Sequence, residues 1–242
     1  MTPDLLKKET RINRLYHLCK KMKNKLKIGV LVSGSGSNLQ SIIDNIEKGL
    51  LDAVITVVVS NNPHAYAIER AKKHQIPSVV LENKDYGSRD EFDGAMVNIL
   101  KSYSVELVVM AGFMRVLSPV FLNSFHMKIM NIHPAVLPSF PGIHAQKRAA
   151  EYGVKFSGCT VHFADEGVDT GPVIIQAIVP AYDDDTEDTL AARILREEHR
   201  IYPQAIQFYA EGRIEVKDRK VHIEGIDKIP AISMHNPSLI GF

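Results

Sequence analysis

The chain has 242 residues, of which 45% are hydrophobic and 24% charged, and its formal net charge is +1. This balance excludes a general polyanion-binding surface, so we expect no nucleic-acid partner. The only cysteines, Cys19 and Cys159, exclude a disulfide scaffold and a cysteine-rich zinc site. No apolar run approaches ~18 residues, the length of a membrane span, and the start of the chain has no signal-peptide core. These features predict a cytoplasmic globular protein without membrane contact.

Residues 1–26 differ from the rest of the chain in charge. They contain eight Lys or Arg against two Asp or Glu, a net of +6, which leaves −5 for the remainder because the whole chain carries +1. We interpret this segment as a basic N-terminal extension that is either disordered or mis-started, since Met22 stands just ahead of the first predicted strand. The predicted domain then covers residues 27–225, and residues 226–242 form a C-terminal tail.

Short apolar runs alternate with helical patterns from residue 27 to residue 133. The runs predict strands over 27–33, 53–60, 78–81, 105–111 and 128–133, and the patterns predict helices over 38–48, 65–74, 88–103 and 118–125. Because these strands are apolar throughout, both faces of their sheet should be covered. We therefore expect an α/β fold with a doubly wound, mostly parallel sheet and a Rossmann-like N-terminal half.

The pattern changes after residue 134. A proline-rich loop leads to a short helix that ends near Tyr152, and two further strands are predicted over 158–164 and 173–179. A long amphipathic helix follows over 186–210, capped by Asp185 or Thr186. A weak strand pair over 213–216 and 220–224 precedes the tail. The whole body is predicted to be one domain.

The first candidate site is the loop from Gly34 to Asn38, between a predicted strand and a helix. Its glycines allow a tight turn, and the free N–H groups at a helix start attract a phosphate. A dinucleotide site would have a third glycine where Leu39 stands and an acid at the end of the next strand, which instead closes with Ser60 and two asparagines. The lysine that a Walker-type ATP-binding loop has after its last glycine is absent as well. The loop therefore fits a monophosphate, and the alternative is a glycine turn without a ligand.

Asn131 and His133 are the second candidate, at the carboxyl end of a late strand. Residues two apart in a strand face the same side, and Pro134 keeps His133 extended. An amide beside an imidazole can stabilise an oxyanion and handle a proton. Asp169, in a loop bounded by glycine and proline, could orient such an imidazole or keep it protonated. The alternatives are a histidine that bonds only its own loop, and ordinary turn chemistry for Asp169.

Seven motifs in order, within a match that runs from about residue 27 to residue 216, are similar to those of a known family. They are VSGSGSNLQ, SRDEFD, AGFMRVLSP, NIHPAVLPSFPG, GCTVHF, DTGPVIIQ and EEHRIYP. Together they resemble the phosphoribosylglycinamide formyltransferases, the folate-dependent enzymes of purine synthesis. The resemblance implies the formyltransferase fold, and transfer of a formyl group from 10-formyltetrahydrofolate to the amine of glycinamide ribonucleotide. It also implies small-molecule partners and no metal, and it leaves open a monomer or a homodimer.

The resemblance assigns roles residue by residue. The residues implied to bind the ribonucleotide are Gly36, Ser37, Asn38 and Glu198. The residues implied to bind the folate are Arg89, Met114, Arg115, Val116, Leu117 and Asn131, with Arg115 near the glutamate tail and the backbone around Leu117 near the pterin. The implied catalytic residues are Asn131, His133 and Asp169. Ser35 and Thr170 depart from common family residues by small polar changes.

The implied mechanism gives each catalytic residue a task. Asn131 and a protonated His133 stabilise the oxyanion formed when the amine attacks the formyl carbon. Asp169 raises the pKa of His133 through its charge and helps to move the proton from the attacking to the leaving nitrogen.

Three alternatives share this fold. A methionyl-tRNA formyltransferase would need a further C-terminal RNA-binding domain, for which the last 30 or so residues are too short. A formyltetrahydrofolate hydrolase would be expected to have a folded domain before the first strand. A non-catalytic sensor of a phosphate-bearing ligand would not need Asn131, His133 and Asp169 together.

The charge asymmetry leads to a first prediction. A chain that begins at Met22 should keep its formyl-transfer activity and its melting temperature, because residues 1–21 are expected to lie outside the folded domain. Both quantities can be compared with those of the full chain, by enzyme assay and thermal unfolding. A large loss of either would show that the basic segment packs on the domain or contributes to the site.

Overall fold

The computed structural model describes residues 25–226, 234 and 236. The interpretation of residues 1–24 as a disordered or mis-started extension, and that of most of the C-terminal tail, concerns residues outside this range. Within it the chain forms one nine-stranded sheet with the strand order β3-β2-β1-β4-β5-β6-β7-β9-β8. The first strand begins at Leu26, one residue earlier than expected.

The N-terminal half is a parallel sheet wound with helices. Its strands are β1 (Leu26–Val32), β2 (Ala53–Ser60), β3 (Ser78–Val80), β4 (Leu107–Met110) and β5 (Ile129–His133). Its helices are α2 (Ser37–Glu47), α3 (Tyr66–Lys73), α4 (Arg89–Ser102) and α5 (Pro119–Ser124), with a 3-10 turn at Asn83–Asp85. All neighbouring strands of this half run parallel. The expected doubly wound, mostly parallel sheet is therefore confirmed.

The C-terminal half reverses the strand direction. It contains α6 (Ala145–Tyr152), β6 (Phe156–Phe163), β7 (Val173–Pro180), α7 (Glu187–Ala210), β8 (Ile214–Lys217) and β9 (Lys220–Ile223). Strand β6 is antiparallel to both β5 and β7, and β8 and β9 form an antiparallel pair. Thr186 caps α7 through a reciprocal capping box with Thr189, which decides between the two expected caps.

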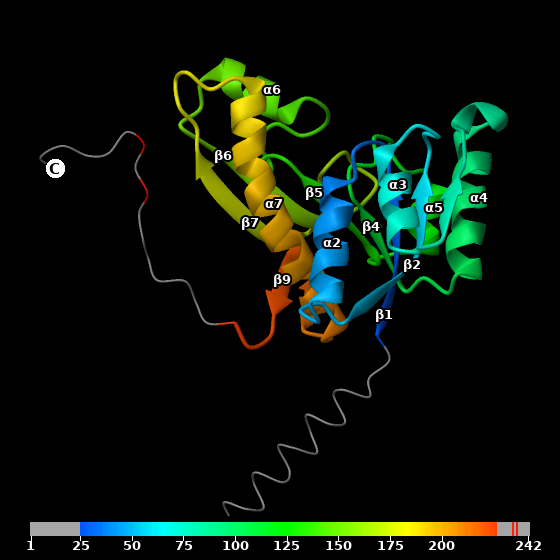
Figure 1. Cartoon of the computed structure of the whole chain (residues 1–242). Helices are drawn as coiled ribbons and strands as arrows, with labels where there is room; N and C mark the ends of the chain where they lie inside the picture. The colour runs from blue at the N-terminus through cyan, green and yellow to red at the C-terminus, as the bar shows by residue number, and fades with distance from the viewer. Residues whose placement is uncertain (1–24, 227–233, 235, 237–242) are drawn as a thin grey trace, which may run out of the picture.

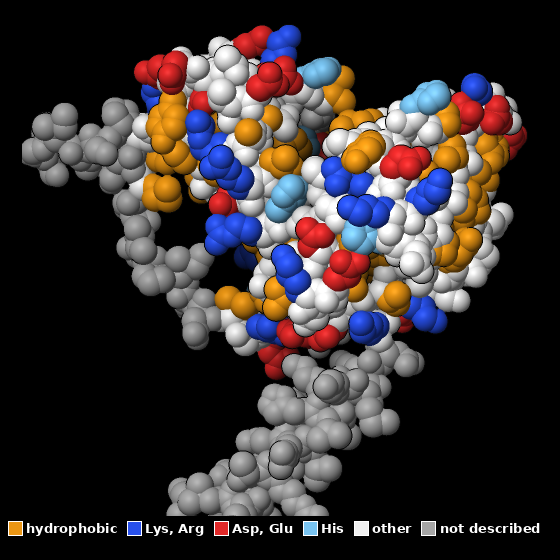
Figure 2. Space-filling view, viewed as in Figure 1, with side chains coloured by type: hydrophobic (Ala, Val, Ile, Leu, Met, Phe, Trp, Pro, Cys, Tyr) orange, Lys and Arg blue, Asp and Glu red, His pale blue; other side chains and the backbone are white. Residues whose placement is uncertain are grey.

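Helices cover both faces of the sheet. One buried cluster joins apolar residues of α2, α3, α6 and α7 to one face, and a second joins α4 and α5 to the other. Helices α2 and α7 lie side by side on the first face (Figure 1). On the face shown in Figure 2, acidic and basic side chains are interspersed, so no charge of one sign dominates it. None of the described helices combines the length and the apolar character needed to cross a membrane.

Tyr202 of α7 fixes the helix to the two central strands. Its side chain is fully buried, and its hydroxyl lies 3.0 Å from the carbonyl oxygen of Met110 and 2.9 Å from that of Met130. The hydroxyl has one hydrogen and can donate to either carbonyl. Met110 is the last residue of β4 and Met130 lies in the neighbouring strand β5, so this contact joins α7 to both strands.

We predict that Tyr202→Phe lowers the free energy of unfolding by about 1 kcal/mol, because buried carbonyls then lose their donor. Urea unfolding measures the change. Tyr209→Phe is the matched control, since the Tyr209 hydroxyl makes no hydrogen bond within the described residues and its ring also lies on α7. Equal stability losses in the two variants would contradict a role for the Tyr202 hydroxyl.

Candidate active site

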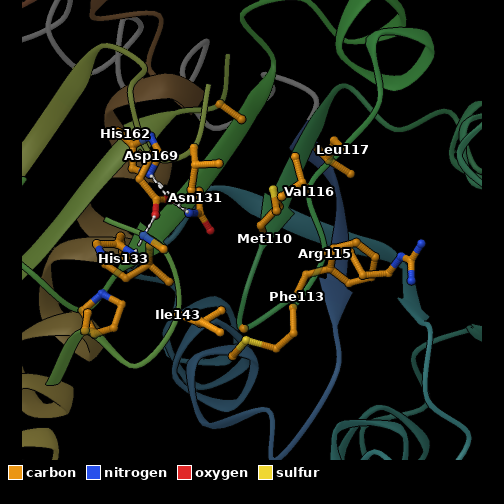
Figure 3. Close-up of a pocket in the computed structure, with 18 of the residues that line it drawn as sticks. Met110, Phe113, Arg115, Val116, Leu117, Asn131, His133, Ile143, His162 and Asp169 are labelled. Atoms are coloured by element: carbon orange, nitrogen blue, oxygen red, sulfur yellow. Dashed lines mark hydrogen bonds and ion pairs between the residues drawn. The ribbon is translucent and has the colours of Figure 1, made fainter. Parts of the chain in front are cut away.

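A cavity of about 540 Å³ opens at the carboxyl ends of β4 and β5 (Figure 3). Parallel α/β sheets place ligands at this edge, and the size fits a small organic molecule. Its wall comes from the loops after β4, β5 and β6. The residues that line it include Met110, Phe113, Met114, Arg115, Val116, Leu117, Asn131, His133, Ile143, His162 and Asp169.

His133 contacts oxygen atoms through both ring nitrogens. Its Nδ1 lies 3.2 Å from Oδ2 of Asp169, and its Nε2 lies 2.9 Å from the carbonyl oxygen of Phe140. The ring is only 5% exposed. A carboxylate and a carbonyl can only accept hydrogen bonds, so an imidazolium would donate to both. The neutral ring donates to one of them, which leaves the other nitrogen ready to take a proton.

Asn131 lies beside the same carboxylate. Its Nδ2 donates to Oδ1 of Asp169 at 3.3 Å and lies 3.2 Å from Nε2 of His162. Asn131 and His162 face each other across the antiparallel pair β5–β6, which explains their contact. Nε2 of His162 also lies 3.6 Å from Oδ1 of Asp169. The structure thus brings Asn131, His133 and Asp169 together and adds a fourth residue, His162.

No role was predicted for His162 from the sequence. A usable signal exists in the alternation of β6, where the polar residues Thr160 and His162 alternate with the apolar residues Cys159, Val161 and Phe163. Both are buried, at 0% and 2% exposure. Buried polar side chains two apart on one strand indicate a network on that face. No group of three or more His, Cys, Asp or Glu side chains in the described part of the chain is arranged to hold a metal ion.

The loop between β6 and β7 folds back over the strand pair β5–β6 and carries Asp169. The Asp169 carboxylate accepts a 2.7 Å hydrogen bond from the N–H of Gly142. It therefore joins the loop after β6 to the loop after β5. Asp169 has a left-handed backbone with φ of +55°. At Gly171 a Cβ would lie 1.8 Å from the carbonyl oxygen of Phe163, so only glycine allows the chain to re-enter the sheet here.

Burial disfavours the charged form of both Asp169 and His133. Burial alone would raise the pKa of Asp169, but hydrogen bonds from His162 and from the Gly142 N–H, with the nearby His133, lower it to about 2. For His133 burial dominates and lowers the pKa below its usual 6.5, although the Asp169 charge raises it. The Asp169 charge thus acts on the pKa of His133 in the direction that the resemblance implies, and burial acts against the protonated form.

The phosphate loop (residues 34–38) lies at the start of α2. Gly36 has φ of +70°, and a Cβ there would lie 2.6 Å from that of Ala67, which explains the glycine. Ser37 and Asn38 occupy the first turn, where backbone N–H groups have no partner within the helix. Asn38 is buried, and its Nδ2 donates to Glu198 at 2.7 Å, while its Oδ1 has no hydrogen-bond partner within the described residues.

Glu198 lies on α7, 160 positions after Asn38 along the chain, and is 6% exposed. Burial raises the pKa of this carboxyl group, and the Asn38 hydrogen bond partly offsets that effect. The four residues expected to bind a ribonucleotide, Gly36, Ser37, Asn38 and Glu198, therefore lie at one place. That place is outside the wall of the 540 Å³ cavity.

The residues expected to bind a folate are only partly gathered. Arg115, Val116 and Leu117 lie on the side of the cavity opposite Asn131 (Figure 3), and Met114 also lines the cavity. The guanidinium of Arg115 points away from Asn131 and lies 5.0 Å from the centre of the Phe92 ring. Its Nε is buried without a hydrogen-bond partner among the described residues. Arg89 is exposed at the start of α4 and does not line the cavity.

Comparisons with known proteins agree with this geometry. The sequence profile described as "Formyl transferase" matches residues 26–206. A phosphoribosylglycinamide formyltransferase of Haemophilus influenzae is 42% identical over 199 residues, which cover 82% of this chain and 94% of that protein. The crystal structure of glycinamide ribonucleotide transformylase 1 from Symbiobacterium toebii has a TM-score of 0.82 and 46% identity, and the match covers 84% of this chain and 95% of that one.

Longer proteins contain a similar segment. The trifunctional purine biosynthetic protein adenosine-3 of Chironomus tentans is 45% identical over 212 residues, which cover 86% of this chain. The same match covers only 15% of that relative, so the chain spans a small part of its length.

The site geometry predicts the effect of Asp169 on the His133 titration. Replacing Asp169 with Asn should lower the pKa of His133 further, because the negative charge that favours the imidazolium is removed. NMR titration of the His133 ring in both proteins measures the shift. Asp165→Asn is the control, since the Asp165 carboxylate bonds Thr170 and Gly167 in the same loop and not a histidine. An upward shift, or none, in Asp169→Asn would contradict the electrostatic coupling.

Proposed function

The chain belongs to the formyl transferase family, and from this premise we propose that it is a phosphoribosylglycinamide formyltransferase. It transfers the formyl group of 10-formyltetrahydrofolate to the amine of glycinamide ribonucleotide in purine biosynthesis. One observation carries the proposal: the cluster of Asn131, His133 and Asp169 opens onto a cavity whose wall residue Met114 is hydrogen-bonded to Ser33, the residue just before the phosphate loop. The two substrates are small molecules, and each has a separate place in the fold.

The ribonucleotide phosphate is assigned to the phosphate loop. The first-turn N–H groups of Ser37 and Asn38 and the dipole of α2 favour an anion there, and Gly36 provides the turn. Glu198 lies beside Asn38 and contributes a carboxyl group that can accept hydrogen bonds from sugar hydroxyls.

The folate is assigned to the cavity, through the folate loop (residues 112–117) and Asn131. Apolar side chains such as Phe113 and Leu117 suit a flat ring, and backbone groups near Leu117 can pair with its polar edge. The residues present also fit an acidic tail, because Arg115 has a buried Nε without a partner in the described chain. Arg89, outside the cavity wall, is assigned to the same tail beyond the rim.

The co-substrate supplies a formyl carbon that the ribonucleotide amine attacks. Holding both reactants in adjoining sites makes this reaction effectively intramolecular. Asn131 is assigned to the negative charge that develops on the formyl oxygen. One of its N–H groups bonds Asp169, and exchange of the 3.2 Å contact with His162 for one with the substrate frees the other.

His133 is assigned to proton transfer. Because burial lowers the pKa of His133 and so favours the neutral ring, the ring can accept a proton that the attacking amine releases. The ionised Asp169 then stabilises the imidazolium, which returns the proton to the leaving nitrogen. For this step Nε2 must exchange its contact with the Phe140 carbonyl for one with the substrate.

Two other functions use parts of the same site. A formyltetrahydrofolate hydrolase would release formate with water as nucleophile, and a sensor would bind the nucleotide without turnover. The phosphate loop with Glu198 favours a nucleotide substrate over water. An assay with both substrates separates the three possibilities, since it follows formyl transfer, formate release and nucleotide binding in parallel. Formate release without transfer, or binding without either reaction, would overturn the proposal.

Asp169→Asn should lower turnover by about 100-fold or more, because the imidazolium loses its counter-charge. The affinities for both substrates should stay near those of the unchanged protein, because Asp169 is assigned to neither binding site. Steady-state kinetics and binding titrations give the two readouts, with Asp165→Asn as the control. Turnover equal to that of the unchanged protein would reduce Asp169 to a loop residue.

A further inference from the structure

Ser33 lies between the two loops assigned to the two substrates. It follows β1 directly and precedes the phosphate loop in the chain. The folate loop follows the neighbouring strand β4 and contacts Ser33 through Gly112 and Met114. Ser33 is half-buried and does not line the cavity, so its influence must act through the residues that it contacts.

Two hydrogen bonds tie Ser33 to the backbone of the folate loop. Its N–H donates to the carbonyl of Gly112 at 3.0 Å, and the N–H of Met114 donates to its Oγ at 2.9 Å. Met114 begins the four-residue run 114–117, which lines the cavity. The hydroxyl of Ser33 therefore sets the position of that run relative to β1.

The end of β2 fixes the direction of the Ser33 hydroxyl. Its hydrogen is donated to Oδ1 of Asn61 at 2.6 Å, so a lone pair remains to accept from Met114. The Ser33 carbonyl accepts from Nδ2 of Asn62 at 3.2 Å. The two asparagines stand where a dinucleotide-binding fold would place an acid, and here they hold Ser33 in place.

The phosphate loop is also hydrogen-bonded to helix α3. The carbonyl of Gly34 accepts from the N–H of Ala67 at 3.1 Å, and that of Ser35 accepts from Nε of Arg70 at 2.9 Å. A continuous set of hydrogen bonds thus runs from α3 through the phosphate loop and Ser33 to the folate loop.

We infer that Ser33 is a positioning residue that couples the two substrate sites. This inference rests on the proposed function, because it takes the two loops as the ribonucleotide and folate sites. A phosphate bound at residues 36–38 restrains the loop that begins at Ser33, and the Ser33 hydroxyl passes that restraint to Met114. Bound ribonucleotide therefore strengthens folate binding, and by linkage bound folate strengthens ribonucleotide binding by the same factor.

Isothermal titration calorimetry tests the coupling with tetrahydrofolate, which lacks the formyl group and cannot react. Its Kd is measured with and without saturating glycinamide ribonucleotide. In the unchanged protein the ribonucleotide should lower this Kd by about 5-fold, the lower end of usual coupling between sites. The coupling is the ratio of the Kd without ribonucleotide to the Kd with it. In Ser33→Ala this ratio should fall close to one, while in Ser33→Thr, which keeps a hydroxyl, it should stay near the value of the unchanged protein. A purely structural role would weaken binding without changing the ratio.

Two further variants keep the test decisive. Asn61→Ala frees the Ser33 hydroxyl to rotate and should reduce the ratio even if Ser33→Ala folds poorly. Thr56→Val removes a hydroxyl that also bridges β2 to β1, through the carbonyl of Ile28, and should leave the ratio unchanged. An unchanged ratio in both Ser33→Ala and Asn61→Ala, or a ratio of one in the unchanged protein, would overturn the coupling. Absence of formyl transfer by the unchanged protein would instead overturn the proposed function, and with it this inference.

Discussion

The ionised carboxylate of Asp169 is the constraint on which the geometry of the site depends. A charge removed from water is stable only when hydrogen bonds and opposite charges replace its hydration. Asn131, His133, His162 and the Gly142 N–H supply these contacts. Because Asn131 and His133 belong to β5, His162 to β6 and Gly142 to the loop after β5, the carboxylate joins two strands and two loops. The same contacts give the imidazole of His133 a fixed orientation and a nearby counter-charge.

Two halves of the sheet contribute differently to this arrangement. The parallel half ends β1, β4 and β5 at one edge, so the phosphate loop, the folate loop and His133 all start from neighbouring strands. The antiparallel strand β6 then places His162 directly opposite Asn131 and returns through the loop that holds Asp169. The residues proposed to bind the substrates therefore come mainly from the parallel half, whereas the orientation of the polar cluster needs both halves.

The sequence predicted most of the fold because strand and helix patterns are local. It also predicted that Asn131 and His133 share a face, since that follows from the period of a strand. It could not show the antiparallel pairing of β6, which is why His162 was missed. Nor could it show that Asn38 meets Glu198, 160 positions away, or that burial lowers the pKa of His133. These depend on which segments pack together, and composition and spacing carry little information about that.

The left-handed backbone at Asp169 has a consequence for how substitutions there are read. Asparagine and aspartate tolerate positive φ better than other residues with a side chain, because their short polar groups bond locally. Alanine at this position would remove the carboxylate and also carry a backbone penalty on the order of 1 kcal/mol. The effect of an alanine substitution at Asp169 would therefore combine the loss of the charge with the backbone penalty. It would overstate the part of the lost stability that is due to the charge. The residue at this position is therefore restricted by main-chain conformation as well as by chemistry.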